Sequence, residues 1–437
     1  MNTSRLVGLG VAIAVVLLGA GGASAQMEPA GEPDDPWYGT EYDTEATEAE
    51  PAAEPGAEPE PGSEPGSEPG SEPGSEPGSE PGSEPGSEPG SESEPESESE
   101  SDAEERYWRT LTFTPGAQVF AEYDLDIYDE AGSTEYFHEF DVPRVWLWTA
   151  FALGDVRARL LMEGARATGA GSLVGVGGDS VVVRFREAWL GYRAWDLFEL
   201  RAGIVPTMTA PALGTAWGMR PIAQTGVRRF EVLQPADLGV NLTFDIPERF
   251  GRLGVGFYNG EGYRGRELNR GKNTELFGEI HPLAFVPELA PLAIIGAYQL
   301  GSSGTGLARS DRLTGALAWI HSQIGAGVAA TYVLGFEERG SQEGALIEAW
   351  ARGNPWEGLM LAARVNHFIR RLDQDSDTLT ELTFSVGYRL FGVIGAHVAV
   401  DGRFGGDEAL ATMPGYERWR LRVIAEGSFE HAFTGVL

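Results

Sequence analysis

The sequence predicts an all-β fold, a transmembrane antiparallel β-barrel of about 16 strands that follows a disordered acidic linker. Residues 418–433 alternate between apolar and charged side chains, as expected of a strand between lipid and water. The chain opens with an export signal, and no apolar run of about 18 residues, the length of a spanning helix, occurs. Only helices and closed sheets satisfy the backbone in lipid, so an exported chain of alternating strands is predicted to be a barrel.

Residues 1–25 have the features of a secretory signal peptide. Arg5 supplies the charged start, residues 6–18 the apolar core, and Ala23-Ser24-Ala25 the small-residue cleavage site. We therefore expect an exported mature protein that begins near Gln26. The sequence contains no cysteine, so neither disulfides nor thiolate metal sites are expected to stabilise it.

Residues 26–104 are predicted to form a disordered acidic linker in the periplasm. They hold 26 of the 66 acidic residues and no Lys or Arg, and residues 61–92 are eight consecutive Pro-Gly-Ser-Glu units. Such a segment has too little apolar surface to offset the entropy of ordering, and its like charges extend it. An unstructured spacer is the main interpretation, and contact with the cell wall is the alternative. Most of the formal net charge of −34 is therefore local to this linker.

Residues 105–437 are predicted to form the barrel. Alternating segments separated by turn residues place strands at 117–128, 137–151, 155–167, 180–193, 197–205, 236–246, 250–259, 272–282, 290–301, 309–321, 324–336, 343–353, 357–370, 377–390, 393–404 and 417–433. Short and long connections alternate between them, as in bacterial barrels with short periplasmic turns. This parity favours 16 strands, with 18 as the alternative, and either number leaves an aqueous lumen.

The closing strand shows the alternation most clearly. Trp419, Leu421, Val423, Ala425, Gly427 and Phe429 fall on one face, opposite Arg418, Arg420, Arg422, Glu426 and Glu430. The chain continues for four residues beyond Phe433, the aromatic residue near its end.

The connection at about 206–235 is the candidate functional element, because it is long and basic. It contains Arg220, Arg228 and Arg229 against a single acid, Glu231. A loop of this length without evident structure is usually functional or disordered. If it folds into the lumen, its arginines are expected to attract anions at a constriction. The alternative is that they pair with wall carboxylates and only shape the loop.

Further arginines lie on faces that the alternation assigns to the lumen. These are Arg157, Arg159, Arg184, Arg186, Arg364, Arg370, Arg389, Arg403, Arg418, Arg420 and Arg422. A charge facing lipid at the bilayer midplane costs about 2–4 kcal/mol, which favours inward or interfacial positions. The carboxylates Glu163, Glu348, Glu381, Asp401, Glu426 and Glu430 are predicted to face the same way. Two arrangements remain open. The arginines and carboxylates form pairs that produce an electric field across the lumen, or the wall presents a row of arginines alone.

One region consists of Ala236-Asp237-Leu238-Gly239-Val240, residues 254–263, and then Lys272, Glu275 and Pro282. This region resembles the phosphate-selective porin O and P family. The resemblance is clearest over 230–285. It implies a trimeric sixteen-stranded channel in the outer membrane of a Gram-negative bacterium, for small anions. Members that bind substrate use several pore lysines, whereas Lys272 is the single lysine of this chain.

Taken together, these features predict a porin for the passive diffusion of small anionic, phosphate-like solutes. No cofactor, metal or nucleic acid is expected, and outer-membrane lipid and lipopolysaccharide are the expected surroundings of a homotrimer. An enzyme is not expected, because no Gly-x-Ser-x-Gly motif occurs and the six histidines fall on different strands. The alternative is a structural barrel whose acidic tether organises the envelope, with little selective transport.

Overall fold

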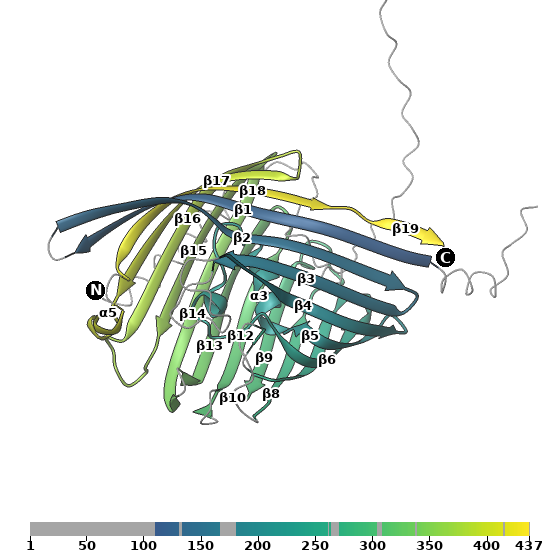
Figure 1. Cartoon of the computed structure of the whole chain (residues 1–437). Helices are drawn as coiled ribbons and strands as arrows, with labels where there is room; N and C mark the ends of the chain where they lie inside the picture. Colours follow the sequence, from purple (N-terminus) through teal and green to yellow (C-terminus); the bar gives the residue numbers. More distant parts are fainter. Residues whose placement is uncertain are drawn as a thin grey trace, which may run out of the picture. The chain divides into compact units, whose positions relative to one another are not determined.

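A computed structural model describes residues 110–130, 133–166, 181–260, 262–263, 271–303, 308–336, 339–413 and 416–436. The predicted signal peptide and acidic linker lie outside the described residues, as does most of the connection after 259. The described part is a closed antiparallel barrel of sixteen strands, as predicted (Figure 1). None of its helices is long and apolar enough to cross a membrane.

The sixteen strands follow one another around the barrel in chain order. They are β1 (Thr110–Glu130), β2 (Ser133–Leu153), β3 (Val156–Arg166), β4 (Val181–Ala194), β5 (Phe198–Pro206), β6 (Ala236–Ile246), β7 (Gly251–Tyr258), β8 (Asn273–Ile280), β9 (Leu292–Leu300), β12 (Asp311–Ile320), β13 (Ile324–Phe336), β14 (Arg339–Trp356), β15 (Leu359–Ile369), β16 (Thr378–Leu390), β17 (Ile394–Gly405) and β18 (Arg418–Glu430). β1 pairs with both β2 and β18, which closes the barrel. Each predicted strand corresponds to one of these.

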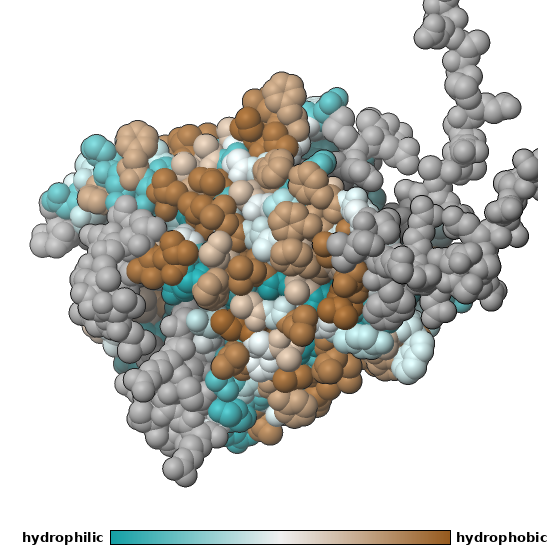
Figure 2. All heavy atoms as spheres, turned by 45° about the vertical axis from the view of Figure 1, so that its right-hand side comes forward, coloured by the Kyte–Doolittle hydropathy of each residue, from teal (hydrophilic) through white to brown (hydrophobic). Residues whose placement is uncertain are grey.

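Alternation places one face of each strand in the lumen and the other outside. On β18, Trp419, Leu421 and Val423 are 48%, 38% and 48% exposed, while Arg422 and Glu426 on the opposite face are buried inside. The outer surface is accordingly rich in hydrophobic side chains (Figure 2). This pattern suits lipid outside and water inside.

The first hairpin differs from the prediction of a loop between residues 128 and 137. Pairing of β1 with β2 continues to Glu130 opposite Ser133, so the hairpin extends beyond the neighbouring strands (Figure 1). The rings of Tyr123 and Phe140 lie 4.8 Å apart across it, and such cross-strand aromatic pairs stabilise a sheet. Ile127, Tyr128, Thr134 and Tyr136 are aromatic or β-branched residues, which favour a strand close to the turn.

The chain end continues the closing seam rather than stopping at the aromatic residue. After a break behind Glu430, β19 (Phe433–Val436) pairs with the start of β1, with Phe433 opposite Phe113. The rings of these two residues lie 6.3 Å apart. The predicted single strand 417–433 is therefore two strands, and the residues after Phe433 lengthen the contact with β1.

Truncation after Phe433 is expected to destabilise the barrel by about 1–3 kcal/mol, since it removes part of a backbone ladder with a net value of about 1 kcal/mol per hydrogen bond. Urea titration of the folded band on a cold SDS gel measures the effect. An unchanged unfolding midpoint would show that β19 contributes nothing to closure.

The connections contain the remaining elements. The short turns include the 3-10 helix η1 (Pro247–Arg249), and a small hairpin of β10 (Ser302–Ser303) and β11 (Ala308–Arg309) follows β9. The helix α5 (Asp407–Thr412) precedes β18. Between β5 and β6 the chain forms α3 (Thr209–Trp217) and α4 (Gly226–Arg229).

Candidate functional site: a helical loop and an arginine-lined cavity

The segment between β5 and β6 packs against lumen-facing side chains of the barrel wall. α3 contacts β12, β13 and β14, and it appears within the ring of strands in Figure 1. Leu213, Ala216 and Trp217 of α3 are fully buried against apolar residues that include Ile295 and Leu346. One side of the lumen therefore contains a hydrophobic core instead of open water. The sequence reasoning did not predict these helices.

The start of α3 is held by Glu275 on β8. Its carboxylate accepts hydrogen bonds from the backbone N–H groups of Met208 (3.0 Å) and Thr209 (2.9 Å). The hydroxyls of Thr209 and Tyr258 donate to the same carboxylate at 2.6 and 3.0 Å. Because an unpaired helix N-terminus carries partial positive charge, a buried carboxylate there stabilises the helix.

The start of α4 is held in the same way by Glu348 on β14. The backbone N–H of Val227 donates to Glu348 Oε1 at 2.9 Å, and Arg364 Nη2 lies 3.7 Å from the same oxygen. Arg364 also donates to the backbone carbonyl of Gln224. Arg364, predicted as a pathway residue, is thus buried against the loop that it holds.

Gly226 leaves the space that Glu348 occupies, because a Cβ atom at Gly226 would overlap Oε1 of Glu348. Gly226→Ala is expected to cost about 1–3 kcal/mol, the usual penalty for overpacking, and to displace α4. The change should appear as altered single-channel conductance with an intact barrel. Gly214→Ala is the matched control, since nothing lies within 4 Å of a Cβ there.

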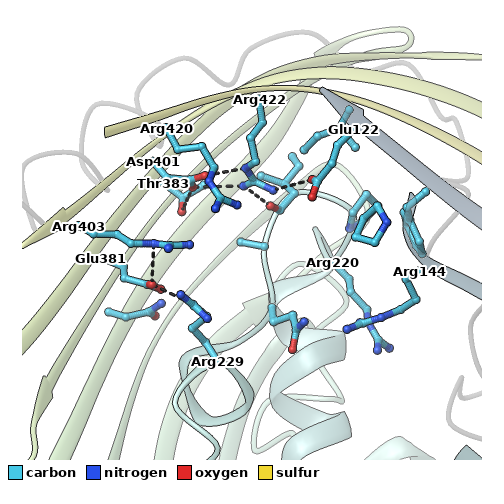
Figure 3. A pocket seen from close by; sticks show the side chains of 18 residues that line it. Glu122, Arg144, Arg220, Arg229, Glu381, Thr383, Asp401, Arg403, Arg420 and Arg422 are labelled. Atoms are coloured by element: carbon cyan, nitrogen blue, oxygen red, sulfur yellow. Dashed lines mark hydrogen bonds and ion pairs between the residues drawn. The ribbon is translucent and has the colours of Figure 1, made fainter. Parts of the chain in front are cut away.

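A cavity of about 200 Å³ remains beside the loop, lined by β1, β2, β15 to β18 and residues 220–224 and 229. Its charged lining consists of six arginines and three carboxylates, namely Arg144, Arg220, Arg229, Arg403, Arg420 and Arg422 with Glu122, Glu381 and Asp401. Figure 3 shows Arg144 and Arg220 on one side, Glu381 and Asp401 with their arginines on the other, and Glu122 between Arg422 and Arg144. The cavity therefore has an asymmetric distribution of charge.

On the β16 to β18 side, arginines and carboxylates form close ion pairs. Arg422 Nε lies 2.6 Å from Asp401 Oδ2, and Arg422 also donates to the carbonyl of Ile222 in the loop at 2.5 Å. Glu381 lies between Arg229 of the loop and Arg403 of the wall, at 2.9 and 3.2 Å from their Nε atoms. Much of the charge of this side is therefore balanced locally.

The closing seam carries a second set of ion pairs. Arg420 contacts Asp126 at 2.7 Å and Asp124 at 3.3 Å, and Arg418 contacts Asp126 at 3.1 Å. These arginines were predicted only as wall residues of the lumen. The structure pairs them across β1 and β18, two strands that lie about as far apart in the sequence as the barrel allows.

On the opposite side, three guanidinium groups surround one tryptophan ring. The guanidinium carbons of Arg220, Arg186 and Arg144 lie 3.7, 4.9 and 5.6 Å from the ring centroid of Trp146. Trp146 Nε1 donates to Glu163 Oε1 at 3.3 Å. We call these five residues the Trp146 cluster.

Arg228 of α4 lies beside this cluster. Burial lowers the pKa of Arg228 well below its usual value, and the like charges of Arg186 and Arg144 lower it further. Glu163 acts in the opposite direction as a smaller effect. Arg186 is itself 6% exposed, and its buried Nε has no hydrogen-bond partner in the described part of the chain. Several arginines therefore gather here, and Arg144 pairs with Glu163 at 3.2 Å.

The other predicted pathway residues are more scattered. Arg159 lies 3.5 Å from Glu187, Arg184 lies 3.8 Å from Glu163, and Arg389 lies 2.8 Å from Glu426, all on lumen faces. Arg157 is half-buried on β3, and Arg370 lies 3.5 Å from Asp377. Lys272 precedes β8 and is exposed, and it does not line the cavity.

Sequence reasoning missed Arg144 and Trp146 as site residues. Arg144 follows Pro143 where the register of β1 and β2 shifts by a bulge, so its face is not evident from alternation. It also missed Arg312, which donates to the loop carbonyl of Val232 at 3.0 Å. Arg312 lies on the lumen face of β12, so the alternation of side chains along that strand could have identified it.

A closed sixteen-stranded antiparallel barrel with a helical loop packed inside it is the fold of the outer-membrane porins. The structure is similar to an anion-selective porin from Comamonas acidovorans, with a TM-score of 0.50 and 14% identity, covering 74% of this chain and 100% of that one. It is also similar to a loop L8 deletion mutant of OmpT, an outer membrane protein of Vibrio cholerae, with a TM-score of 0.50 and 12% identity, covering 73% and 99%.

No family model matches this sequence. No curated protein matches it either. At these low identities the structural likeness establishes the fold.

Proposed function

We propose that this protein is an outer-membrane channel of a Gram-negative bacterium through which small anions, including phosphate, diffuse passively. The observation that supports the proposal is the gathering of Arg144, Arg186, Arg220 and Arg228 around Trp146, where Arg144 pairs with Glu163 at 3.2 Å. The cavity beside it has twice as many arginines as carboxylates. A throat of this kind between low-dielectric walls raises the local concentration of anions and repels cations.

Arginine suits such a channel because its planar guanidinium offers several N–H donors to carboxylate or phosphate oxygens. Arg220 comes from the loop and Arg144 from the wall, and both line the cavity, so an anion in the cavity would meet both. Arg229 and Arg403 share Glu381 across the cavity, and they are expected to contribute less to the net field.

The expected surroundings follow from the outer face and from the family resemblance. We propose that the apolar outer surface contacts lipid and lipopolysaccharide and that three copies assemble into a homotrimer. Chemical cross-linking in native outer membranes, followed by gel analysis, tests this assembly. A ladder that stops at the monomer would reject it.

The proposed transport is tested by reversal potentials of the purified full-length protein in planar bilayers. In a tenfold KCl gradient, chloride is expected to permeate several times faster than potassium. Phosphate added to the same open channels is expected to reduce the chloride current. A closed barrel or a cation preference would refute the proposal and would favour a structural barrel.

The same measurement on a variant with Arg220, Arg228 and Arg229 all replaced by alanine locates the effect. Anion preference is expected to fall by severalfold. Arg371→Ala is the matched control, because that arginine pairs with Asp377 and Glu408 at the outer rim and does not line the cavity. Unchanged selectivity in the triple variant would move the selective step to the wall.

A further inference from the structure

Tyr263 lies in the connection after β7 and contacts the wall at β3 and β4, which are four and three strands away around the barrel. Its hydroxyl donates to Glu163 Oε2 on β3 at 2.5 Å. The guanidinium carbon of Arg184 on β4 lies 5.9 Å from the centroid of the tyrosine ring. A second connection, besides the loop between β5 and β6, therefore contacts lumen-facing side chains of the wall.

Contacts with the start of β6 fix the backbone on both sides of this turn. The N–H of Gly260 donates to Asp237 Oδ2 at 2.7 Å, and the N–H of Tyr263 donates to the carbonyl of Ala236 at 3.0 Å. Gly262, between them, has a φ of +73°, a conformation that glycine adopts without steric cost. The local sequence therefore determines the direction in which the Tyr263 side chain leaves the turn.

Glu163 connects this turn to several parts of the wall. It is fully buried, and Arg144 Nε and Trp146 Nε1 lie 3.2 and 3.3 Å from its Oε1, while the Tyr263 hydroxyl donates to its Oε2. The helix α4 lies beside the same contact, since burial lowers the pKa of Arg228 most strongly and Tyr263 and Glu163 raise it by smaller effects. A hydroxyl donating to an ionised carboxylate over such a short distance belongs to the strong class of hydrogen bonds. Its loss is therefore expected to release the turn from the wall.

The lumen face of β3 and β4 near this contact is buried, although it faces the interior of the barrel. Glu163, Ala165 and Arg186 are 0%, 7% and 6% exposed. Among the described residues, the lining of the arginine-lined cavity includes none from β3 or β4, and β1, β2 and β15 to β18 bound it together with the loop. The space that a solute can reach therefore lies away from the wall that Tyr263 contacts.

We propose that Tyr263 is a positioning residue of the channel, whose hydroxyl bond to Glu163 keeps the turn after β7 against β3 and β4 and leaves the arginine-lined cavity as the route for anions. This inference rests on the proposed function. It adds that a second connection, together with the loop between β5 and β6, determines where a solute passes.

The test uses single cysteines in the full-length protein, because the chain contains no cysteine of its own. Ala165→Cys places a thiol on the buried lumen face of β3, two residues from Glu163, and Ala223→Cys places one on the lining of the cavity. An anionic thiosulfonate reagent is added to open channels in a planar bilayer, and the rate at which the current changes is measured. The Ala223→Cys channel is expected to react severalfold faster than the Ala165→Cys channel.

Tyr263→Phe removes the hydroxyl donor and keeps the ring. With this change the Ala165→Cys channel is expected to react severalfold faster, while the rate of the Ala223→Cys channel stays the same. Tyr258→Phe is the matched control, because the hydroxyl of Tyr258 donates at 3.0 Å to Glu275, another buried carboxylate, at the start of α3. This control is expected to leave the rate of the Ala165→Cys channel unchanged, whereas a general weakening of the barrel would raise the rate with either change.

Equal rates for the Ala165→Cys channel with and without Tyr263→Phe would overturn the inference, as would the same increase with Tyr258→Phe. If Ala165→Cys does not give a folded barrel on unheated SDS gels, the single-channel conductance of Tyr263→Phe decides. A higher conductance than that of the wild type supports the inference, and an unchanged conductance overturns it. A wild type without anion preference in a tenfold KCl gradient would instead reject the proposed function, whatever the reaction rates show about Tyr263.

Discussion

Replacement of Glu348 with alanine is expected to release α4 from the barrel wall and to raise the single-channel conductance. The carboxylate is 1% exposed, accepts the N–H of Val227 at 2.9 Å and faces Arg364 at 3.7 Å. Its removal leaves a buried guanidinium without this partner, and breaking a buried pair in this way costs about 3–5 kcal/mol. Local displacement of the loop is the least costly way to restore solvent to Arg364.

The measurement is single-channel recording of the Glu348→Ala protein, with current noise as a second readout. A mobile loop is expected to add fluctuations on the open level, because Arg229 of α4 and residues 220–224 line the cavity. Glu343→Ala on the same strand is the control, since Glu343 is exposed near the start of β14. A conductance that matches the wild type in both variants would show that Glu275 and the apolar core of α3 are sufficient to fix the loop.

The strands were predictable because each has one face toward the aqueous lumen and one apolar face on the outside of the barrel. That requirement produces alternation within a single segment, as in Trp419 and Arg420 on β18, and a local pattern needs no knowledge of the neighbours. The hairpin of β1 and β2 was underestimated at residues 129–136, which were predicted as a loop. There the strand extends beyond its neighbours, so the contrast between the faces weakens.

The candidate site was only partly predictable, because its partners come from distant strands. Arg220 was identified from a basic loop, but its contact with Trp146 depends on the packing of α3 and α4 against the wall. Similarly, Arg420 was assigned to the lumen by alternation, whereas its pairing with Asp126 depends on the register of the closing seam. Neither packing nor seam register is contained in a local pattern.

Reversal of charge at Arg220 is expected to change selectivity more than the same reversal at Arg229. Arg220→Glu removes one positive charge beside Arg144 and Arg186 and adds a negative one, on the lining of a cavity where arginines outnumber carboxylates. At separations near 4 Å, a unit charge contributes about 1 to 4 kcal/mol depending on the local dielectric, which is enough to invert a modest preference. The channel is therefore expected to become cation-preferring at low salt.

Arg229→Glu supplies the comparison, since Arg229 is exposed on the cavity and shares Glu381 with Arg403. Its new carboxylate is expected to swing away from Glu381 into solvent, with a smaller shift of the reversal potential. Raising the salt from 0.1 to 1 M shortens the Debye length from about 10 to about 3 Å and should reduce the difference between the variants. Equal shifts at low salt would mean that the field at the constriction is uniform and that the Trp146 side has no special role.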